Sequence, residues 1–306
     1  MLDLNKIYCQ DCFEFLDEID NNVADLAIID PPYGMKKGVW DNFKTYNDYL
    51  FFTRKWIDKL IPKIKESGSF YFFNTAYNSA YILQYLNEKK IKVRNWIVWN
   101  IPNGLAGFSK KNYSNRHETI LFFTKSDNYI FNFDDIRVPY FEGGRKKSNR
   151  EIEGKIGQYN LLGALCGNDW KDNYISNFDD IRVPYSEGGQ KKSNREIKGK
   201  IWQYNPLGAL CGNVWKFSNE SSSCRNTLNG KKQFLPHPCM KNLDLIMRII
   251  KASSNENDLV LDCFAGIGTI LVAAKNLHRN FIGCDSNLGY VEIANKYLQT
   301  GSYHFK

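Results

Sequence analysis

Two short apolar runs, far apart in the chain, each end in a turn that carries the chemistry of a ligand site. Residues 24–29 are followed by Asp30-Pro31-Pro32-Tyr33, and residues 259–263 are followed by Phe264-Ala265-Gly266-Ile267-Gly268-Thr269. Two prolines after a buried strand end its hydrogen-bonded ladder, and a glycine turn lets the backbone approach a ligand closely. Because α/β enzymes bind ligands at the carboxyl ends of their strands, we expect a flat, amine-bearing substrate at one turn and a nucleoside cofactor at the other.

Alternating strand and helix patterns predict a mostly parallel sheet. Buried-strand patterns cover residues 23–29, 68–73, 95–99 and 119–124, with an amphipathic helix over 46–65. Near the C-terminus a second series predicts helix 243–252, strand 258–262, helix 269–276, strand 280–285 and helix 290–298. This alternation is typical of a Rossmann-like, doubly wound α/β fold with helices on both faces of the sheet.

Between these two series lies a tandem duplication. Residues 128–172 and 173–217 align without gaps over 45 positions and differ at only 8 of them. Solenoid repeats diverge except at packing positions and need three or more units, so this pair indicates a segmental duplication inside one module. Trp202, Val214 and Phe217 make the second copy more apolar toward its end, and its net charge is +3 against 0 for the first. The second copy therefore suits a polyanion better.

The overall charge and the cysteines narrow the class of protein. With 41 Lys and Arg against 33 Asp and Glu, the 306-residue chain carries a net charge of +8, which supports a polyanionic partner without requiring one. The sequence has no apolar stretch of about 18 residues and no basic-then-apolar leader, so we expect a cytoplasmic protein that crosses no membrane. Its 8 cysteines do not form a disulfide framework or a zinc motif and are expected to be reduced and buried.

Asp30-Pro31-Pro32-Tyr33 suits chemistry on an exocyclic amine. Such an amine is a poor nucleophile because its lone pair is delocalised into the ring. Hydrogen bonds to the Asp30 carboxylate and the Pro31 carbonyl would favour a tetrahedral nitrogen whose lone pair points at an electrophilic methyl group. Adenine and cytosine carry such an amine, but it is inaccessible while the base is stacked inside a nucleic-acid duplex. Tyr33 would stack on a base that has been turned out of the duplex. The alternative is a plain acidic strand end before a proline turn, because short motifs recur by chance.

The glycine turn is supported by the elements around it. A predicted strand precedes Phe264, a predicted helix follows Gly268, and Asp285 ends the next strand 19 positions beyond Gly266. An acidic residue at that place can accept both ribose hydroxyls of a nucleoside, and the missing third glycine argues against NAD. The alternative is a tight turn with a solvent-facing aspartate.

Together these motifs resemble the beta group of S-adenosylmethionine-dependent DNA amino-methyltransferases, most closely the adenine-N6 enzymes of type IIS restriction-modification systems. In that group the Asp-Pro-Pro-Tyr half comes first, a target-recognition module second and the Phe-x-Gly-x-Gly half last. The resemblance implies a catalytic half at 1–127, a duplicated recognition insert at 128–233 and a cofactor-binding half at 234–306. It also implies S-adenosylmethionine as cofactor, double-stranded DNA with a flipped adenine as substrate, a cognate restriction endonuclease as partner, and a monomer or homodimer.

The resemblance assigns roles to single residues. The catalytic residues would be Asp30, Pro31, Pro32 and Tyr33, with no metal, and the cofactor would be bound by Asp11, Cys12, Lys241, Phe264, Gly266, Gly268, Thr269 and Asp285. Trp40-Asp41 and His117-Glu118 resemble further segments of the group. His237-Pro238-x-x-Lys241 is similar to its His-Pro-x-x-Lys-Pro motif, with Asn242 in place of the final proline.

Four other functions stay open on the sequence. Cytosine-N4 methylation shares the mechanism, although an aspartate rather than a serine at position 30 resembles the adenine pattern. Related enzymes that modify protein amides carry Asn-Pro-Pro-Tyr and place the cofactor glycines first, unlike this chain, and an RNA methyltransferase is the other competitor. The duplication could also have inactivated an older enzyme and left a chain that only binds DNA.

Overall fold

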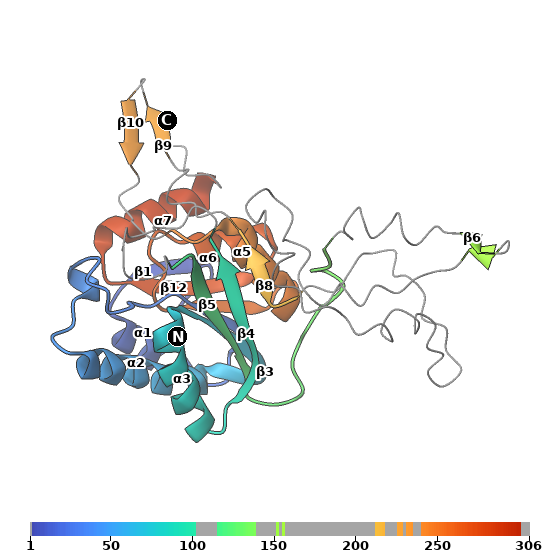
Figure 1. Ribbon diagram of the computed structural model, residues 1–306. Helices are drawn as coiled ribbons and strands as arrows, with labels where there is room; N and C mark the ends of the chain where they lie inside the picture. Colours follow the sequence, from blue (N-terminus) through green and yellow to red (C-terminus); the bar gives the residue numbers. More distant parts are fainter. Residues whose placement is uncertain are drawn as a thin grey trace, which may run out of the picture. The chain divides into compact units, whose positions relative to one another are not determined.

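The computed structural model describes residues 2–101, 115–138, 151–152, 155–156, 212–217, 225–228, 231–234 and 240–300. The chain divides into two units (Figure 1). The first unit comprises residues 1–132 and 216–306, and the second comprises residues 133–215.

A mostly parallel sheet forms the centre of the first unit. Its strands are β1 (Lys6–Cys9), β2 (Ala24–Ile29), β3 (Ile64–Asn74), β4 (Lys92–Asn100), β5 (His117–Thr124), β11 (Leu259–Asp262) and β12 (Asn280–Asp285). They follow the order β1-β12-β11-β2-β3-β5-β4. A further short strand, β8, spans Val214–Lys216. The pairs from β1 to β3 are parallel, whereas β5 is antiparallel to both β3 and β4. The predicted mostly parallel α/β sheet is confirmed.

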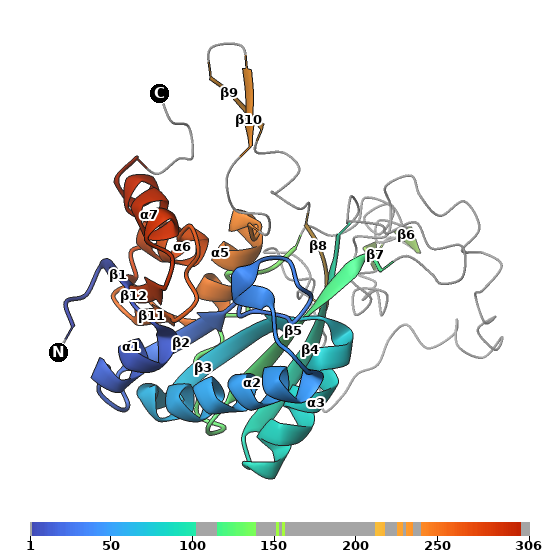
Figure 2. The same ribbon diagram turned by 90° about the vertical axis from the view of Figure 1, so that its left-hand side faces the viewer.

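Helices cover both faces of this sheet (Figure 2). One face carries α1 (Cys12–Glu18), α2 (Tyr46–Leu60) and α3 (Ala76–Glu88), and the other carries α5 (Leu243–Ser253), α6 (Thr269–Asn276) and α7 (Leu288–Thr300). Short 3₁₀ turns span Val39–Asp41 and Ile61–Lys63. Within the described ranges, none of the helices has the length and apolar character that a membrane crossing requires.

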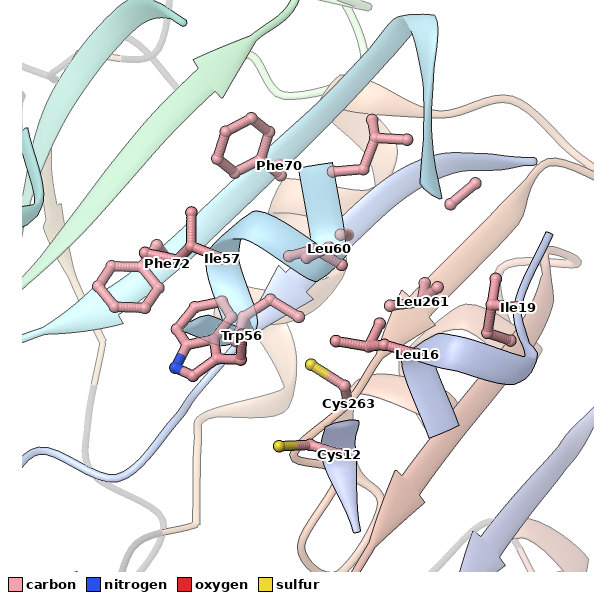
Figure 3. Packing of buried hydrophobic residues seen from close by; sticks show 14 of the residues in the cluster. Cys12, Leu16, Ile19, Trp56, Ile57, Leu60, Phe70, Phe72, Leu261 and Cys263 are labelled. Carbon is pink, nitrogen blue, oxygen red and sulfur yellow. The ribbon is translucent and has the colours of Figure 1, made fainter. Parts of the chain in front are cut away.

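The strand that leads to Asp30 lies in the middle of the core. Every residue of β2 is buried, because helices pack on both of its faces. Figure 3 shows part of this core, where Trp56 of α2 packs beside Phe72 of β3 with ring centroids 5.3 Å apart. Burial of a large apolar side chain contributes about 1.5–3 kcal/mol. The edge of the sheet that bears the predicted motifs therefore rests on a well-packed support.

The helix predicted over 46–65 is wrong at its C-terminal end. Helix α2 begins with a capping box, in which the Thr45 hydroxyl accepts a hydrogen bond from the Asp48 amide and the Asp48 carboxylate accepts one from the Thr45 amide. It ends at Leu60, the 3₁₀ turn follows, and β3 already starts at Ile64. Pro62 explains this boundary, because a proline ring clashes with the carbonyl four residues earlier in a continuing helix.

The second unit contains the antiparallel pair β6 (Glu151–Ile152) and β7 (Lys155–Ile156). Another antiparallel pair, β9 (Arg225–Leu228) and β10 (Lys231–Phe234), belongs to the first unit. Most of the duplication, and most of the insert predicted at 128–233, lies outside the described residues. The predicted domain boundaries therefore remain a prediction.

Candidate active site

The carboxyl ends of β2, β11 and β12 meet at a cavity of about 500 Å³ in the first unit. The two motif turns come together there because β2 and β11 are paired neighbours in the sheet. The predicted site residues that line the cavity are Asp11, Cys12, Asp30, Pro31, Pro32, Tyr33, Lys241, Phe264, Gly266, Thr269 and Asp285. Gly268 lies in the same turn as Gly266 and is the N-cap of α6.

Asp285 sits at the end of β12 with both carboxylate oxygens held by backbone donors. One oxygen accepts a hydrogen bond from the Gly266 amide at 2.9 Å, and the other accepts one from the Asn287 amide at 2.9 Å. Burial raises the pKa of Asp285 above its ordinary value. Each carboxylate oxygen can accept a further hydrogen bond, so acceptor capacity remains for the two hydroxyls of a ribose. The donor and acceptor set fits a nucleoside cofactor.

The glycine turn beside Asp285 needs its glycines for conformation. Gly266 and Gly268 have φ angles of 52° and 84°, a region that L side chains rarely adopt. At Gly268 an added Cβ would also lie 2.8 Å from the Cβ of Ala294 in α7. Next to this turn, the Phe264 ring packs against Phe52 and Trp56 with centroids 6.1 and 5.5 Å away. The cavity thus has an aromatic wall beside its acidic end, which suits a flat ring.

Asp11 and Cys12 form the start of α1, directly after β1. Asp11 is the N-cap, and its carboxylate accepts a hydrogen bond from the Phe13 amide at 2.8 Å. Burial raises the pKa of Cys12 to about 12, so this side chain is a thiol at neutral pH. In Figure 3 it lies at the edge of the core, as does Cys263. All four described cysteines are free as expected, but Cys9 is exposed, so the prediction of buried cysteines is wrong for that residue.

Asp41 shapes the loop that follows the tetrapeptide Asp30–Tyr33. Its carboxylate is buried and accepts hydrogen bonds from the amides of Gly34, Met35 and Lys37 at 2.6, 3.0 and 3.1 Å. Gly34 takes a φ of 71° where the chain turns. The Trp40-Asp41 pair noted in the sequence therefore has a physical role, because the aspartate replaces the missing backbone partners of the loop.

A second set of hydrogen bonds, from α3 and the end of β3, holds the backbone of Tyr33. The Asn78 amide nitrogen donates to the Tyr33 carbonyl at 2.9 Å and to the Asn74 side-chain oxygen at 2.7 Å. Asn74 is fully buried and donates in turn to the Tyr49 hydroxyl at 2.9 Å. The tetrapeptide is thus fixed on the N-terminal part of α3 and the end of β3.

Lys241 binds the acidic side chains of Asp30, in the turn after β2, and of Glu118, in β5. Its ammonium lies 2.9 Å from Asp30, 3.0 Å from Glu118 and 3.1 Å from the Tyr33 hydroxyl. The rings of Tyr33, Phe73 and Trp99 surround the same ammonium at 5.3, 5.3 and 5.7 Å. Asn242, which replaces the expected proline, has a φ of −67° and caps α5 by accepting a hydrogen bond from the Leu245 amide at 3.0 Å. The asparagine therefore supplies a proline-like turn that presents Lys241.

Burial and the neighbouring charges set the titration of this cluster. Burial raises the pKa of Asp30 above its ordinary value, Lys241 opposes that rise, and Glu118 adds to it. The pKa of Tyr33 is raised well above its ordinary value, first by burial and then by the charge of Asp30. Deeper in the sheet, burial also raises the pKa of Asp262 well above its usual range. Lys241 is therefore the cation that favours an ionised Asp30.

Glu118 was not predicted as a site residue, although its segment was noticed in the sequence. Glu118 lies near the N-terminal end of β5. Because β5 is antiparallel to β3, this end lies at the carboxyl edge of the parallel strands, where Thr119 pairs with Asn74 at the end of β3. A strand pattern does not show the direction of its strand, so spacing alone could not find this residue. The structure also places Lys241, predicted to bind cofactor, beside Asp30.

Comparison with known proteins gives the family. The family model described as DNA methylase, for N6 and N4 methyltransferases, matches residues 24–296. The chain belongs to the DNA methylase family. The methylase is 44% identical over 299 residues to the type II methyltransferase M1.MboII of Moraxella bovis, with 96% of each chain covered. It is 30% identical to M.HpaI of Haemophilus parainfluenzae, covering 96% of this chain and 74% of that protein.

Solved structures share the fold of this methylase. The M1.HpyAVI complex with S-adenosylmethionine matches with a TM-score of 0.54 at 24% identity, over 96% of this chain and 99% of that one. The cytosine-N4-specific PvuII DNA methyltransferase matches with a TM-score of 0.59 at 15% identity, over 94% and 84%. The Rossmann-like methyltransferase fold is confirmed, and membership of the family makes the protein a DNA methyltransferase with S-adenosylmethionine as its cofactor.

Proposed function

We propose that this methylase transfers the methyl group of S-adenosylmethionine to N6 of an adenine in a specific duplex sequence, as the modification enzyme of a type II restriction-modification system. The observation that carries the proposal is the Asp30 carboxylate at the end of β2, which lines the same cavity as the glycine turn and Asp285. An acceptor for an amine and a set of groups suited to a nucleoside are thus in one site.

The chain's own residues prepare the amine for attack. Asp30 accepts a hydrogen bond from the N6 amine, the Pro31 carbonyl accepts a second, and the nitrogen lone pair is freed from the ring. The two buried prolines keep this geometry rigid. Tyr33 stacks on the base after it leaves the duplex. Lys241 favours the ionised form of Asp30, which is the form that accepts hydrogen bonds.

The opposite end of the cavity holds the cofactor. Asp285 accepts the ribose hydroxyls, Phe264 packs on a ring, and Gly266 and Thr269 line the space beside them, with Asp11 and Cys12 at the end of β1. When it is bound, the cofactor supplies a methyl group already activated by its sulfonium. Lys241 touches Asp30 and thereby links the cofactor half to the amine half.

Adenine is favoured over cytosine by the aspartate at position 30, and DNA is favoured over RNA or protein by the family. The relationship to M1.MboII, which is itself named a type II methyltransferase, supports the restriction-modification setting and a cognate endonuclease. We propose that the insert with the duplication reads the target sequence, because it is the segment between the two halves of the site. Its boundaries at 128–233 and a monomeric or homodimeric state belong to this proposal.

Transfer of a tritiated methyl group from S-adenosylmethionine tests the function. We expect label in duplex DNA and none in total RNA or in a protein extract treated under the same conditions. An Asp30→Asn variant is the matched control, because its amide keeps the shape but loses the charged acceptor, and it should bind cofactor while methylating at least about 100-fold more slowly. Label in RNA or protein with unlabelled DNA would contradict the proposal, and a chain that binds DNA without methylating it would identify an inactivated remnant.

A further inference from the structure

The Tyr33 hydroxyl lies between two carboxylates. Its oxygen is 2.8 Å from an Asp30 oxygen and 3.0 Å from a Glu118 oxygen. A phenol has one proton and can donate it to only one of these acceptors at a time. The hydroxyl also accepts a hydrogen bond from Lys241 at 3.1 Å. Because the Tyr33 hydroxyl is within hydrogen-bonding distance of both carboxylates, a proton can pass through it from one carboxylate to the other.

The proposed reaction produces a proton that must leave the site. The nitrogen forms a bond to the methyl carbon, the bond from that carbon to sulfur breaks with its electron pair left on sulfur, and the sulfonium becomes a neutral thioether. The nitrogen then carries a positive charge until one N–H proton departs. Asp30 is the carboxylate bound to that amine, so it is the first acceptor. In the protonated form it can no longer polarise the next amine.

We propose that Glu118 receives this proton from Asp30 through the Tyr33 hydroxyl and so restores Asp30 for the next turnover. The inference rests on the proposed amine methylation. Protonated Asp30 gives its proton to the Tyr33 oxygen while the phenolic proton moves to Glu118. The charges balance, because one carboxylate is neutralised as the other is regenerated and Tyr33 ends as it began. Glu118, whose side chain is 22% exposed, then releases the proton to solvent, which returns the relay to its starting state.

Lys241 makes this exchange energetically easy. Its ammonium is almost equally distant from both carboxylates, at 2.9 Å from Asp30 and 3.0 Å from Glu118. The negative charge can therefore move from one to the other without leaving the cation unpaired, which would be costly in a buried site. The ammonium itself is held by the rings of Phe73 and Trp99 and need not move.

The titration of the cluster favours uptake of the amine proton by Asp30. The pKa of Asp30 is raised by burial, which makes it a better proton acceptor than an exposed aspartate. The pKa of Tyr33 is raised well above its ordinary value, so a free phenolate does not accumulate and the two proton movements are concerted. The charged groups facing the relay are Lys241 from the segment before α5 and Asp262 at the end of β11, whose own pKa is raised in part by the charge of Asp30.

Single-turnover and steady-state methylation separate this role from a structural one. In a Glu118→Gln variant we expect methyl transfer in the first turnover at nearly the wild-type rate, followed by a steady-state rate at least about tenfold lower, with the deficit growing as the pH falls. Cofactor and DNA dissociation constants should stay unchanged. Glu66→Gln is the matched control, since Glu66 pairs with Lys125 at 3.4 Å on the exposed part of β3, and it should leave both rates unchanged.

Tyr33→Phe gives an independent test, because it keeps the ring and removes only the hydroxyl. If both groups serve one relay, the variant should lose steady-state rate at least as severely, and adding Glu118→Gln to it should cost little more. Equal losses in the first and later turnovers of Glu118→Gln, or fully additive losses in the double variant, would overturn the relay, as would an unchanged steady-state rate. A wild-type protein that methylates no DNA would instead contradict the proposed function.

Discussion

Removal of the Lys241 ammonium should damage both stability and catalysis, in a way that depends on pH. Lys241→Met keeps much of the side-chain volume between the rings of Phe73 and Trp99 but leaves Asp30 and Glu118 without their shared cation. Breaking a buried ion pair by removal of one partner costs about 3–5 kcal/mol. We therefore expect the free energy of unfolding in urea at neutral pH to fall by about 3 kcal/mol or more.

The same substitution should move the pH profile of methylation to more alkaline values. Lys241 opposes the rise in the pKa of Asp30 that burial causes, so its loss raises that pKa further. If half of a loss of about 3 kcal/mol acts on the ionised form of Asp30, the profile shifts by about one pH unit. Folded Asp30 then binds its proton more tightly than the unfolded chain does, so the stability deficit shrinks as the pH falls through the raised pKa.

Lys59→Met is the matched control for this prediction. Lys59 also pairs with an aspartate, Asp17, but at an exposed site where an ion pair is worth about 0–1 kcal/mol. It should leave the pH profile of methylation unchanged and lower the unfolding free energy by no more than about 1 kcal/mol. If Lys241→Met behaved like this control, or if its activity fell by the same factor at every pH, Lys241 would not be the cation that keeps Asp30 ionised.

Three further substitutions address other parts of the site. Asp285→Asn should weaken cofactor binding, measured by calorimetry, by about 1–3 kcal/mol, because its amide group cannot accept hydrogen bonds on both sides; unchanged affinity would remove Asp285 from the cofactor site. Asp41→Asn should lower the urea unfolding free energy by about 1–3 kcal/mol and slow methylation, since three loop amides lose a charged acceptor. Gly268→Ala should lower the urea unfolding free energy by at least about 1 kcal/mol, because an alanine there must take the positive φ and its Cβ would lie 2.8 Å from the Cβ of Ala294. An unchanged unfolding free energy would show that neither the φ angle nor this contact matters there.

Local patterns in the sequence were sufficient for the parallel part of the sheet. β2, β11 and β12 are short buried runs that end in distinctive residues, and pairing of β2 with β11 follows once both are taken as parallel strands of one sheet. The helix over 46–65 was overextended because its apolar period continues past Leu60, while Pro62 determines the end. The strand β1 was missed because its 4 residues give too short a pattern.

The parts of the candidate site that lie in continuous segments of sequence were predictable. The residues that only the topology of the fold brings to the site were not. Asp30 to Tyr33 and Phe264 to Asp285 are continuous segments whose spacing indicates a turn and its neighbours. Glu118 reaches them only because β5 reverses direction beside β3, and Asn78 reaches Tyr33 only because α3 starts at the same edge. The contact of Lys241 with Asp30 likewise depends on where the segment before α5 crosses the sheet edge.

Mass spectrometry of nucleosides tests most directly which base this methylase modifies. Duplex DNA is treated with the purified chain and S-adenosylmethionine, digested to nucleosides, and compared with DNA treated with the Asp30→Asn variant. We expect N6-methyladenine with the wild-type chain and close to none with the variant. N4-methylcytosine without N6-methyladenine would contradict it.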